Sequence, residues 1–215
     1  TSVQKRVINV KKENIINLRE FRSISIFYCL DLSNNNNITN EQISPLINIA
    51  FLSLCHDQKI TDEGISLLGN LTCLNLWNNR TITNNGLFLL TNLTILNLRH
   101  EQKITDAGIS LLTKLVNLCL HDNGLITNAG ITNLTKLESL NLYSNKQITN
   151  EGISMLTNLT DLDLQRNNQI TNDGISLLTN LTSINLCQNQ MISNTVISLL
   201  TNLKHKQIIQ GGSTI

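Results

Sequence analysis

Leucine and isoleucine recur along the chain at a fixed spacing. The segment LTCLNLWNNRTITNNGLFLLTN begins at Leu71 and is followed at Leu93 by LTILNLRHEQKITDAGISLLTK, so the same apolar positions return every 22 residues. Units of this kind begin near residues 5, 27, 49, 71, 93, 115, 137, 159 and 181, and residues 203–215 form a degenerate last unit. The pattern predicts that residues 1–215 are a single domain of stacked coils, because each unit can bury its apolar side only against its neighbours.

Two periodicities occur inside each unit, whose positions we number from one to twenty-two starting at its first apolar residue. Apolar residues at positions four and six alternate with polar residues at three, five and seven, which predicts a short β-strand with one buried face. Positions seventeen and twenty, such as Ile109 and Leu112, are apolar and about one helical turn apart. Position fourteen is Asn or Asp from the second unit on, and these residues favour helix N-caps. Each coil should therefore run strand, turn, short helix or 3₁₀ turn, and turn, with position fourteen as the cap.

Asparagine recurs at position nine, just after the strand. Six units have it there: Asn35, Asn79, Asn123, Asn145, Asn167 and Asn189. An asparagine that points inward can satisfy backbone N–H and C=O groups of neighbouring turns, so we predict a structural ladder of stacked asparagines. Glu13, Asp57 and Glu101 take this position in other units. Because an ionised carboxylate cannot donate a hydrogen bond, those turns should be locally different or more open.

The pattern L-x-x-L-x-L-x-x-N, in phase through nearly the whole chain, resembles the leucine-rich repeat family. This resemblance implies an α/β fold, a curved right-handed horseshoe with a parallel β-sheet on its concave face and short helices or 3₁₀ turns on its convex face. The segment I-T-N/D-x-G-I is similar to the repeats of F-box proteins and of bacterial effectors, and the L-T-N-L-T junctions are similar to those of internalins. The family implies a binding module without enzymatic activity, which uses the concave strands as its usual contact surface.

A group of large and charged residues falls on the strand positions expected to project from the concave face. At positions seven and eight of the central units and at position five of a later one, the group consists of Trp77, Arg99, His100, His121, Asp122, Tyr143, Arg166 and Asp163. Trp, Tyr and Arg are enriched in binding hot spots. We therefore predict a binding surface for a protein or peptide, with Trp77 and Tyr143 as anchors and the charged residues setting complementarity. The alternative is a solvated face whose side chains pack on each other, for example Arg99 on Trp77.

The sequence favours neither a metal site nor catalysis on this face. His56 and His100 are two coils apart, roughly 9–10 Å at sheet spacing, which is too far for shared zinc coordination. Cys119 with His121, and Asp161 with Asp163, share a face, but no third group completes a catalytic arrangement. We predict no metal, no cofactor and no catalytic residue.

Composition narrows the remaining classes of function. A net charge of +1 with 14% charged residues does not indicate nucleic-acid binding, and without an 18-residue apolar run no membrane span is expected. Five cysteines at strand positions three, five and seven should lie on the concave face, too far apart for disulfides: Cys29, Cys55, Cys73, Cys119 and Cys187. An odd number of thiols favours a reducing compartment, the cytoplasm or a host cytosol, over an extracellular location.

Two functions from different classes remain open. The first is a monomeric interaction scaffold that binds a protein or peptide. The second is the substrate-recognition part of an F-box-like ubiquitin-ligase adaptor, or of a bacterial or viral effector that acts on host proteins. The chain has no initiator Met and begins within a divergent unit, as a fragment of a longer protein would.

Overall fold

The computed structural model describes residues 6–9, 28–35, 37–100 and 103–207. This part of the chain contains one parallel sheet of ten strands, which neighbour each other in chain order. The strands are β1 (Arg6–Asn9), β2 (Tyr28–Asp31), β3 (Ile49–Ser53), β4 (Cys73–Asn75), β5 (Ile95–Asn97), β6 (Asn117–Cys119), β7 (Ser139–Asn141), β8 (Asp161–Asp163), β9 (Ser183–Asn185) and β10 (His205–Gln207). The helices are α1 (Asn40–Ile43), α2 (Asp62–Ile65), α3 (Asn84–Leu87), α4 (Asp106–Ile109), α5 (Asn128–Ile131), α6 (Asn150–Ile153), α7 (Asn172–Ile175) and α8 (Asn194–Leu199).

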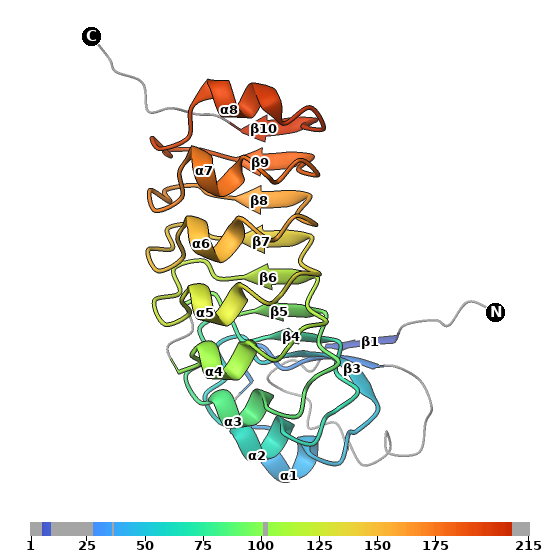
Figure 1. Cartoon of the computed structure of the whole chain (residues 1–215). Helices are drawn as coiled ribbons and strands as arrows, with labels where there is room; N and C mark the ends of the chain where they lie inside the picture. The colour runs from blue at the N-terminus through green and yellow to red at the C-terminus, as the bar shows by residue number, and fades with distance from the viewer. Residues whose placement is uncertain (1–5, 10–27, 36, 101–102, 208–215) are drawn as a thin grey trace, which may run out of the picture.

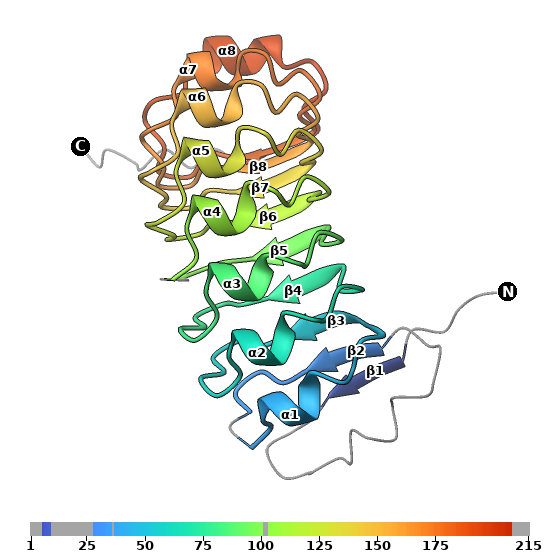
Figure 2. The same cartoon turned by 60° about the horizontal axis from the view of Figure 1, so that its bottom comes forward.

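Strands and helices form two separate columns (Figure 1). The strands stack along one side of the molecule and the short helices along the other, and the view in Figure 2 shows the same division. The register is uniform, with Leu74 opposite Leu96 and Leu96 opposite Leu118, so equivalent side chains form straight columns. The architecture confirms the predicted α/β solenoid with its parallel sheet on the concave face.

The core lies between the two columns. In the coil that begins at Leu93, the apolar side chains Leu96, Leu98, Ile104, Ile109 and Leu112 are all buried. Each fully buried leucine or isoleucine contributes roughly 1.5–3 kcal/mol relative to an exposed one. Because one coil has no second layer of its own, this burial arises only when coils stack.

The prediction that position fourteen caps the helix is wrong. Asn84 is the first helical residue, and the N-cap is Thr83, whose backbone is extended. The Asn84 side chain reaches the next coil instead: its Oδ1 accepts from the backbone N–H of Thr105 and its Nδ2 donates to Thr105 Oγ1, both at 2.9 Å. Coil stacking places these partners within reach, so the side chain bonds between coils rather than capping its own helix.

Position sixteen, which is glycine in the middle units, lies directly against this bond. A Cβ built on Gly108 would be 2.5 Å from Asn84 Oδ1, and one on Gly130 would be 2.5 Å from Asp106 Oδ1. Real Cβ atoms do not approach a neighbour so closely. Glycine at position sixteen therefore makes room for the position-fourteen side chain of the preceding coil.

The asparagines of position nine join neighbouring coils through their buried side chains. Asn79 Oδ1 accepts from the backbone N–H groups of Thr81 and Ile82, and its Nδ2 donates to the carbonyl oxygens of Leu54 and Asp57. Bonds of the same kind are made by Asn145, Asn167 and Asn189, with part of the pattern also at Asn35 and Asn123.

Asp57 occupies this position without opening its turn. The residue is 0% exposed, and its Oδ1 accepts from the N–H groups of Lys59 and Ile60 at 2.8 and 2.9 Å, as an asparagine would. Its Oδ2 is buried without a hydrogen-bond partner among the described residues. Burial raises the pKa of Asp57, outweighing the two backbone donors that lower it. The turn thus differs from its neighbours in the missing donor, not in shape, while Glu13 and Glu101 lie outside the described residues.

The five cysteines that the sequence places on the concave face differ in exposure. Cys55 and Cys187 are buried, whereas Cys29, Cys73 and Cys119 are half-buried, and none of the five is disulfide-bonded in the described chain. Cys55 is a short side chain that directly precedes Trp77 in the column of position seven. Burial raises the pKa of the Cys55 thiol.

The sheet continues into the degenerate last unit. β10 pairs with β9, and Lys206 lies opposite Ile184, where other coils have an inward leucine. The Lys206 side chain is exposed. None of the helices in the described ranges has the length and apolar character that crossing a membrane requires.

Candidate binding surface on the sheet

A tight turn at the end of each strand sets the direction of positions seven and eight. The N–H of Asn79 donates back to the carbonyl of Leu76 at 3.0 Å, and Asn78, between them, has a positive φ of 51°. The described residues with this conformation at position eight are Asn34, His56, Asn78, His100, Asp122, Ser144, Arg166 and Gln188. Because the turn ends the alternation of the strand, side chains at positions seven and eight contact each other across neighbouring coils.

Around Trp77 these contacts form a first stack. The Arg99 guanidinium carbon lies 4.9 Å from the centre of the Trp77 ring, and the His56 ring lies 5.0 Å away at an interplanar angle of 58°. His56 Nδ1 is also 2.8 Å from the amide nitrogen of Asn78. Arg99 Nε is buried without a hydrogen-bond partner in the described part, so packing on Trp77 holds this side chain.

A second stack centres on Tyr143. The His121 ring lies parallel to the Tyr143 ring, with centroids 4.0 Å apart and an interplanar angle of 23°. The Arg166 guanidinium carbon is 5.8 Å from the centre of the same tyrosine ring. Both anchors that the sequence predicts are therefore held by a cationic side chain and a histidine, and both remain partly exposed.

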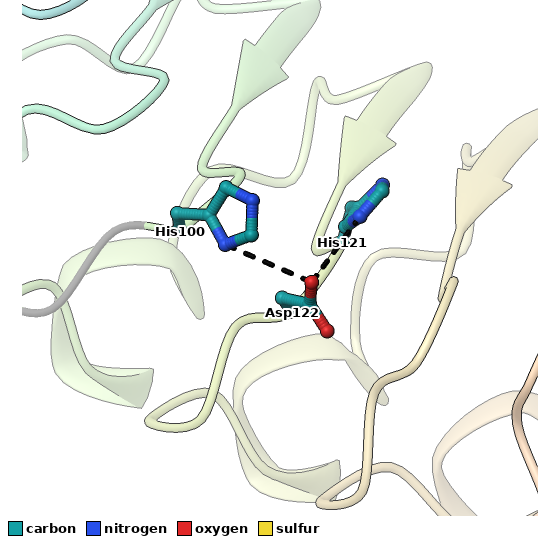
Figure 3. A group of neighbouring side chains, drawn as sticks. All are labelled: His100, His121 and Asp122. Atoms are coloured by element: carbon teal, nitrogen blue, oxygen red, sulfur yellow. Dashed lines mark ion pairs between the residues drawn. The ribbon is translucent and has the colours of Figure 1, made fainter.

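His121 of the second stack also converges with His100 and Asp122 (Figure 3). Asp122 Oδ2 lies 3.3 Å from His121 Nε2 and 3.8 Å from His100 Nδ1. Burial, followed by the nearby Arg99 charge, lowers the pKa of His121, while Asp122 acts in the opposite direction. His121 is thus favoured in its neutral form at neutral pH.

Asp163 lies on the sheet beyond these residues, in an acidic hollow. Its Oδ1 accepts from the N–H of Gln165 at 2.9 Å, and its Oδ2 accepts from Asn141 Nδ2 at 3.1 Å. The hollow is lined by Ser139, Asn141, Asp161, Asp163, Ser183, Ile184, Asn185 and His205. The face therefore has aromatic and cationic groups at its centre and carboxylates towards its C-terminal side.

Cys119 shares this face but is poorly suited to nucleophilic chemistry. Burial raises the pKa of its thiol, and only the thiolate is a strong nucleophile. The His121 group that acts on this sulfur is the backbone N–H, whose hydrogen bond lowers the pKa by less than burial raises it.

The comparisons with known proteins agree with this architecture. A model of the family described as Leucine Rich repeat matches residues 89–113, 133–157 and 156–178. The solved structure of internalin C2 from Listeria monocytogenes is 26% identical with a TM-score of 0.62, and the match covers 91% of this chain and 84% of that one. The chain is a leucine-rich repeat protein.

Other solved leucine-rich repeat structures show the same fold at lower identity. A second Listeria internalin is 22% identical over 90% of this chain and 70% of its own, with a TM-score of 0.55. The Toll–Spatzle complex of Drosophila contains a chain 18% identical over 95% of this chain and 30% of its own, with a TM-score of 0.65. A TLR13–ssRNA13 complex contains a chain that is 23% identical over 95% of this chain and 32% of its own, with a TM-score of 0.69. No curated protein sequence matches the chain.

For this leucine-rich repeat protein, sequence reasoning located most of the residues that the structure brings together. We call Trp77, Arg99, His100, His121, Asp122, Tyr143 and Arg166 the central patch. Asp163 lies apart from it in the acidic hollow, and His56, which the sequence did not single out as a binding residue, packs on Trp77. The sequence does carry a signal for His56. It occupies position eight, one coil before Asn78, and the residues at that position are mostly of types that tolerate a positive φ.

Proposed function

We propose that the chain binds a protein or peptide partner through the central patch on the concave sheet. Leucine-rich repeat proteins generally serve as protein-interaction modules, and catalysis is not typical of them. The observation that supports the site is the pair of stacks around Trp77 and Tyr143, which present aromatic rings and guanidinium groups in fixed positions. Side chains that are already ordered lose less conformational entropy on binding, so more of their contact energy contributes to affinity.

The charges favour a partner of mixed polarity. Arg99 and Arg166 offer positive charge at the patch, and Asp122 and Asp163 offer negative charge beside it and in the hollow. A protein segment with an acidic or aromatic group for the patch and a basic side chain for the hollow fits this arrangement. The TLR13 structure contains single-stranded RNA, but this chain has a net charge of +1 and carboxylates on the same face, so we propose protein rather than nucleic acid.

The test compares partner capture by two variants that keep the core intact. The patch variant combines Trp77→Ala, Arg99→Glu and Tyr143→Ala. The matched control changes three exposed leucines near the helices, Leu67, Leu111 and Leu177, to serine. Surface substitutions usually alter stability by only about 0.5 kcal/mol each, so both variants should fold, which circular dichroism checks.

We expect partners captured by the wild type to be lost with the patch variant and kept with the control. Removal of hot-spot residues costs about 2 kcal/mol or more, roughly a thirtyfold loss of affinity. If the patch variant retains every partner, or if the control loses the same ones, the proposed site is wrong.

The alternative is that the sheet is the substrate-recognition part of an F-box-like ubiquitin-ligase adaptor or of an effector. That alternative predicts co-capture of ligase subunits or of host proteins with the longer protein, whereas a stand-alone scaffold does not. We propose a monomer located in the cytoplasm, or in a host cytosol for an effector, which the odd number of cysteines without a disulfide supports.

A further inference from the structure

We propose that His100, His121 and Asp122 form a binding site for a divalent transition-metal ion of the zinc type (Figure 3). The site lies within the central patch, but ion binding can be measured without any partner. The proposal therefore does not depend on the proposed function, and either can fail without the other.

The first support is the separation of the ligand atoms. One nitrogen from each histidine and one oxygen of Asp122 all lie within 4.8 Å of one another. Zinc bonds of about 2.0–2.2 Å in a tetrahedral site place ligand atoms roughly 3.3–3.5 Å apart. The 3.3 Å between His121 Nε2 and Asp122 Oδ2 already matches. The 3.8 Å between Asp122 Oδ2 and His100 Nδ1, and separations of up to 4.8 Å within the cluster, must shorten by side-chain rotation when an ion binds.

The fold explains why residues from two coils converge. His100 and Asp122 are both at position eight of adjacent coils, where φ is 53° and 49°, so their side chains leave equivalent turns side by side. His121 precedes Asp122 and is oriented by its stacking on Tyr143 at 4.0 Å. A geometry set by packing lowers the entropy that the side chains lose when an ion binds.

The residue types select the class of ion. Two imidazoles and one carboxylate suit Zn²⁺ and other imidazole-preferring divalent ions, whereas Ca²⁺ and Mg²⁺ prefer all-oxygen ligands. Side-chain exposures of 38% for His100 and 35% for Asp122 leave the cluster open to solvent, and that of His121 is only 14%. An ion can thus enter from solvent, and water completes its coordination in the free protein.

Nearby charges act on the site in both directions. The Arg99 guanidinium opposes a cation here, and the carboxylates of Asp122 and Asp163 favour one. The charge of the proposed ligand Asp122 thus acts against that of Arg99, and Asp163 adds to it.

The chain supplies a matched control in His56. It occupies the same position eight with nearly the same φ, 57°, and it also packs on an aromatic ring of the patch. Its Nδ1 faces the Asn78 amide rather than a carboxylate, and it is not in the three-residue cluster. His56→Ala therefore removes a histidine from the same face without removing a proposed ligand.

The experiment titrates metal-free protein without a histidine tag with ZnCl₂ by isothermal calorimetry, and with CoCl₂ by visible absorption. MgCl₂ serves as the oxygen-preferring comparison. The variants are His100→Ala, His121→Ala, Asp122→Asn and His56→Ala, each shown to be folded by circular dichroism. If His121→Ala disturbs the Tyr143 stack, the two more exposed variants still decide the result.

We expect one Zn²⁺ per chain, cobalt d–d bands, and no saturable Mg²⁺ binding. Loss of a ligand should weaken Zn²⁺ affinity by more than the roughly 10–100-fold that loss of an outer-shell partner costs, and His56→Ala should leave it unchanged. Absence of saturable Zn²⁺ binding overturns the proposal. Wild-type affinity in the His100 and Asp122 variants, or equal loss in His56→Ala, also overturns it, because the ion would then bind elsewhere.

Discussion

At the scale of single residues, the chain contains its own comparison between asparagine and aspartate. Asn79 and Asp57 each accept from the backbone N–H groups two and three residues further on, but only Asn79 donates to the preceding coil. The carboxylate thus removes one set of bonds between coils and leaves one buried oxygen without a partner in the described part of the chain. At position nine, replacing the amide nitrogen of asparagine with a carboxylate oxygen therefore lowers the local stability.

Asp57→Asn should therefore stabilise the protein. By analogy with Asn79, the new amide would donate to the carbonyl oxygens of Leu32 and Asn35, and a buried unsatisfied group costs about 1–3 kcal/mol. The free energy of unfolding from urea denaturation at pH 7 should rise by an amount in that range. The reverse change, Asn145→Asp, removes donors to Leu120 and Asn123 and should lower it.

The same comparison predicts a dependence on pH. Because the folded-state pKa of Asp57 is raised, its ionised form opposes folding at any pH above that pKa. As the pH falls through the folded-state pKa towards the unfolded value of about 3.9, the carboxyl protonates and the penalty disappears. The stability difference between Asp57→Asn and wild type should shrink over this window. A difference that stays constant or grows as the pH falls would contradict the assignment.

At the scale of elements, one coil constrains the next through positions fourteen and sixteen. A methyl group on Gly108 would meet Asn84 Oδ1 at 2.5 Å, whereas nothing lies within 4 Å of a Cβ on Gly124. Gly124 also has no positive φ, so an alanine there is not strained. Alanine substitutions at these two glycines therefore distinguish the effect of close packing between coils from the effect of backbone flexibility.

Gly108→Ala should lower the free energy of unfolding by about 1–3 kcal/mol, because Asn84 must move and its bonds to Thr105 weaken. Gly124→Ala should be neutral or stabilising by up to about 1 kcal/mol, since it reduces the entropy of the unfolded chain. Urea denaturation of both variants checks this pair. Equal effects would show that contact with the preceding coil is not what requires glycine at position sixteen.

The elements also show how far sequence reasoning extends. Strand, turn and helix order follow from the spacing of leucine and isoleucine, since each coil has only one way to bury positions four, six, twelve, seventeen and twenty. Position fourteen was misassigned because capping is a local rule, whereas Asn84 bonds across 21 residues of sequence to Thr105. The positive φ at position eight, as at His100, is a property of the turn that one residue identity does not specify.

The same limit applies to the candidate site. The constant repeat length places Trp77, Arg99, His121 and Tyr143 in one column, so their neighbourhood was predictable. The convergence of Asp122 with both histidines was not, because it depends on the turn that brings positions seven and eight together. The distance expected from strand spacing applies to His56 and His100, which are two coils apart. The residues that converge come instead from His100 and from the adjacent coil.

At the scale of the whole molecule, the regular register gives the protein two faces with different chemistry. The sheet carries the central patch and the acidic hollow, whereas exposed leucines such as Leu67, Leu111 and Leu177 lie two residues after the ends of α2, α4 and α7. Partner binding on the sheet and partner binding on the helices therefore predict contacts from different residues. A probe placed on each face can distinguish them.

The most direct test places a photo-crosslinking amino acid at Asn117 in β6, on the sheet, or at Leu111, just after α4 and 65% exposed. Cross-linked partners would then be compared by mass spectrometry in lysate from the native source. The account predicts a partner cross-linked from position 117 and absent from position 111, and lost when Trp77, Arg99 and Tyr143 are also replaced. A partner cross-linked from position 111 alone would contradict binding on the concave sheet.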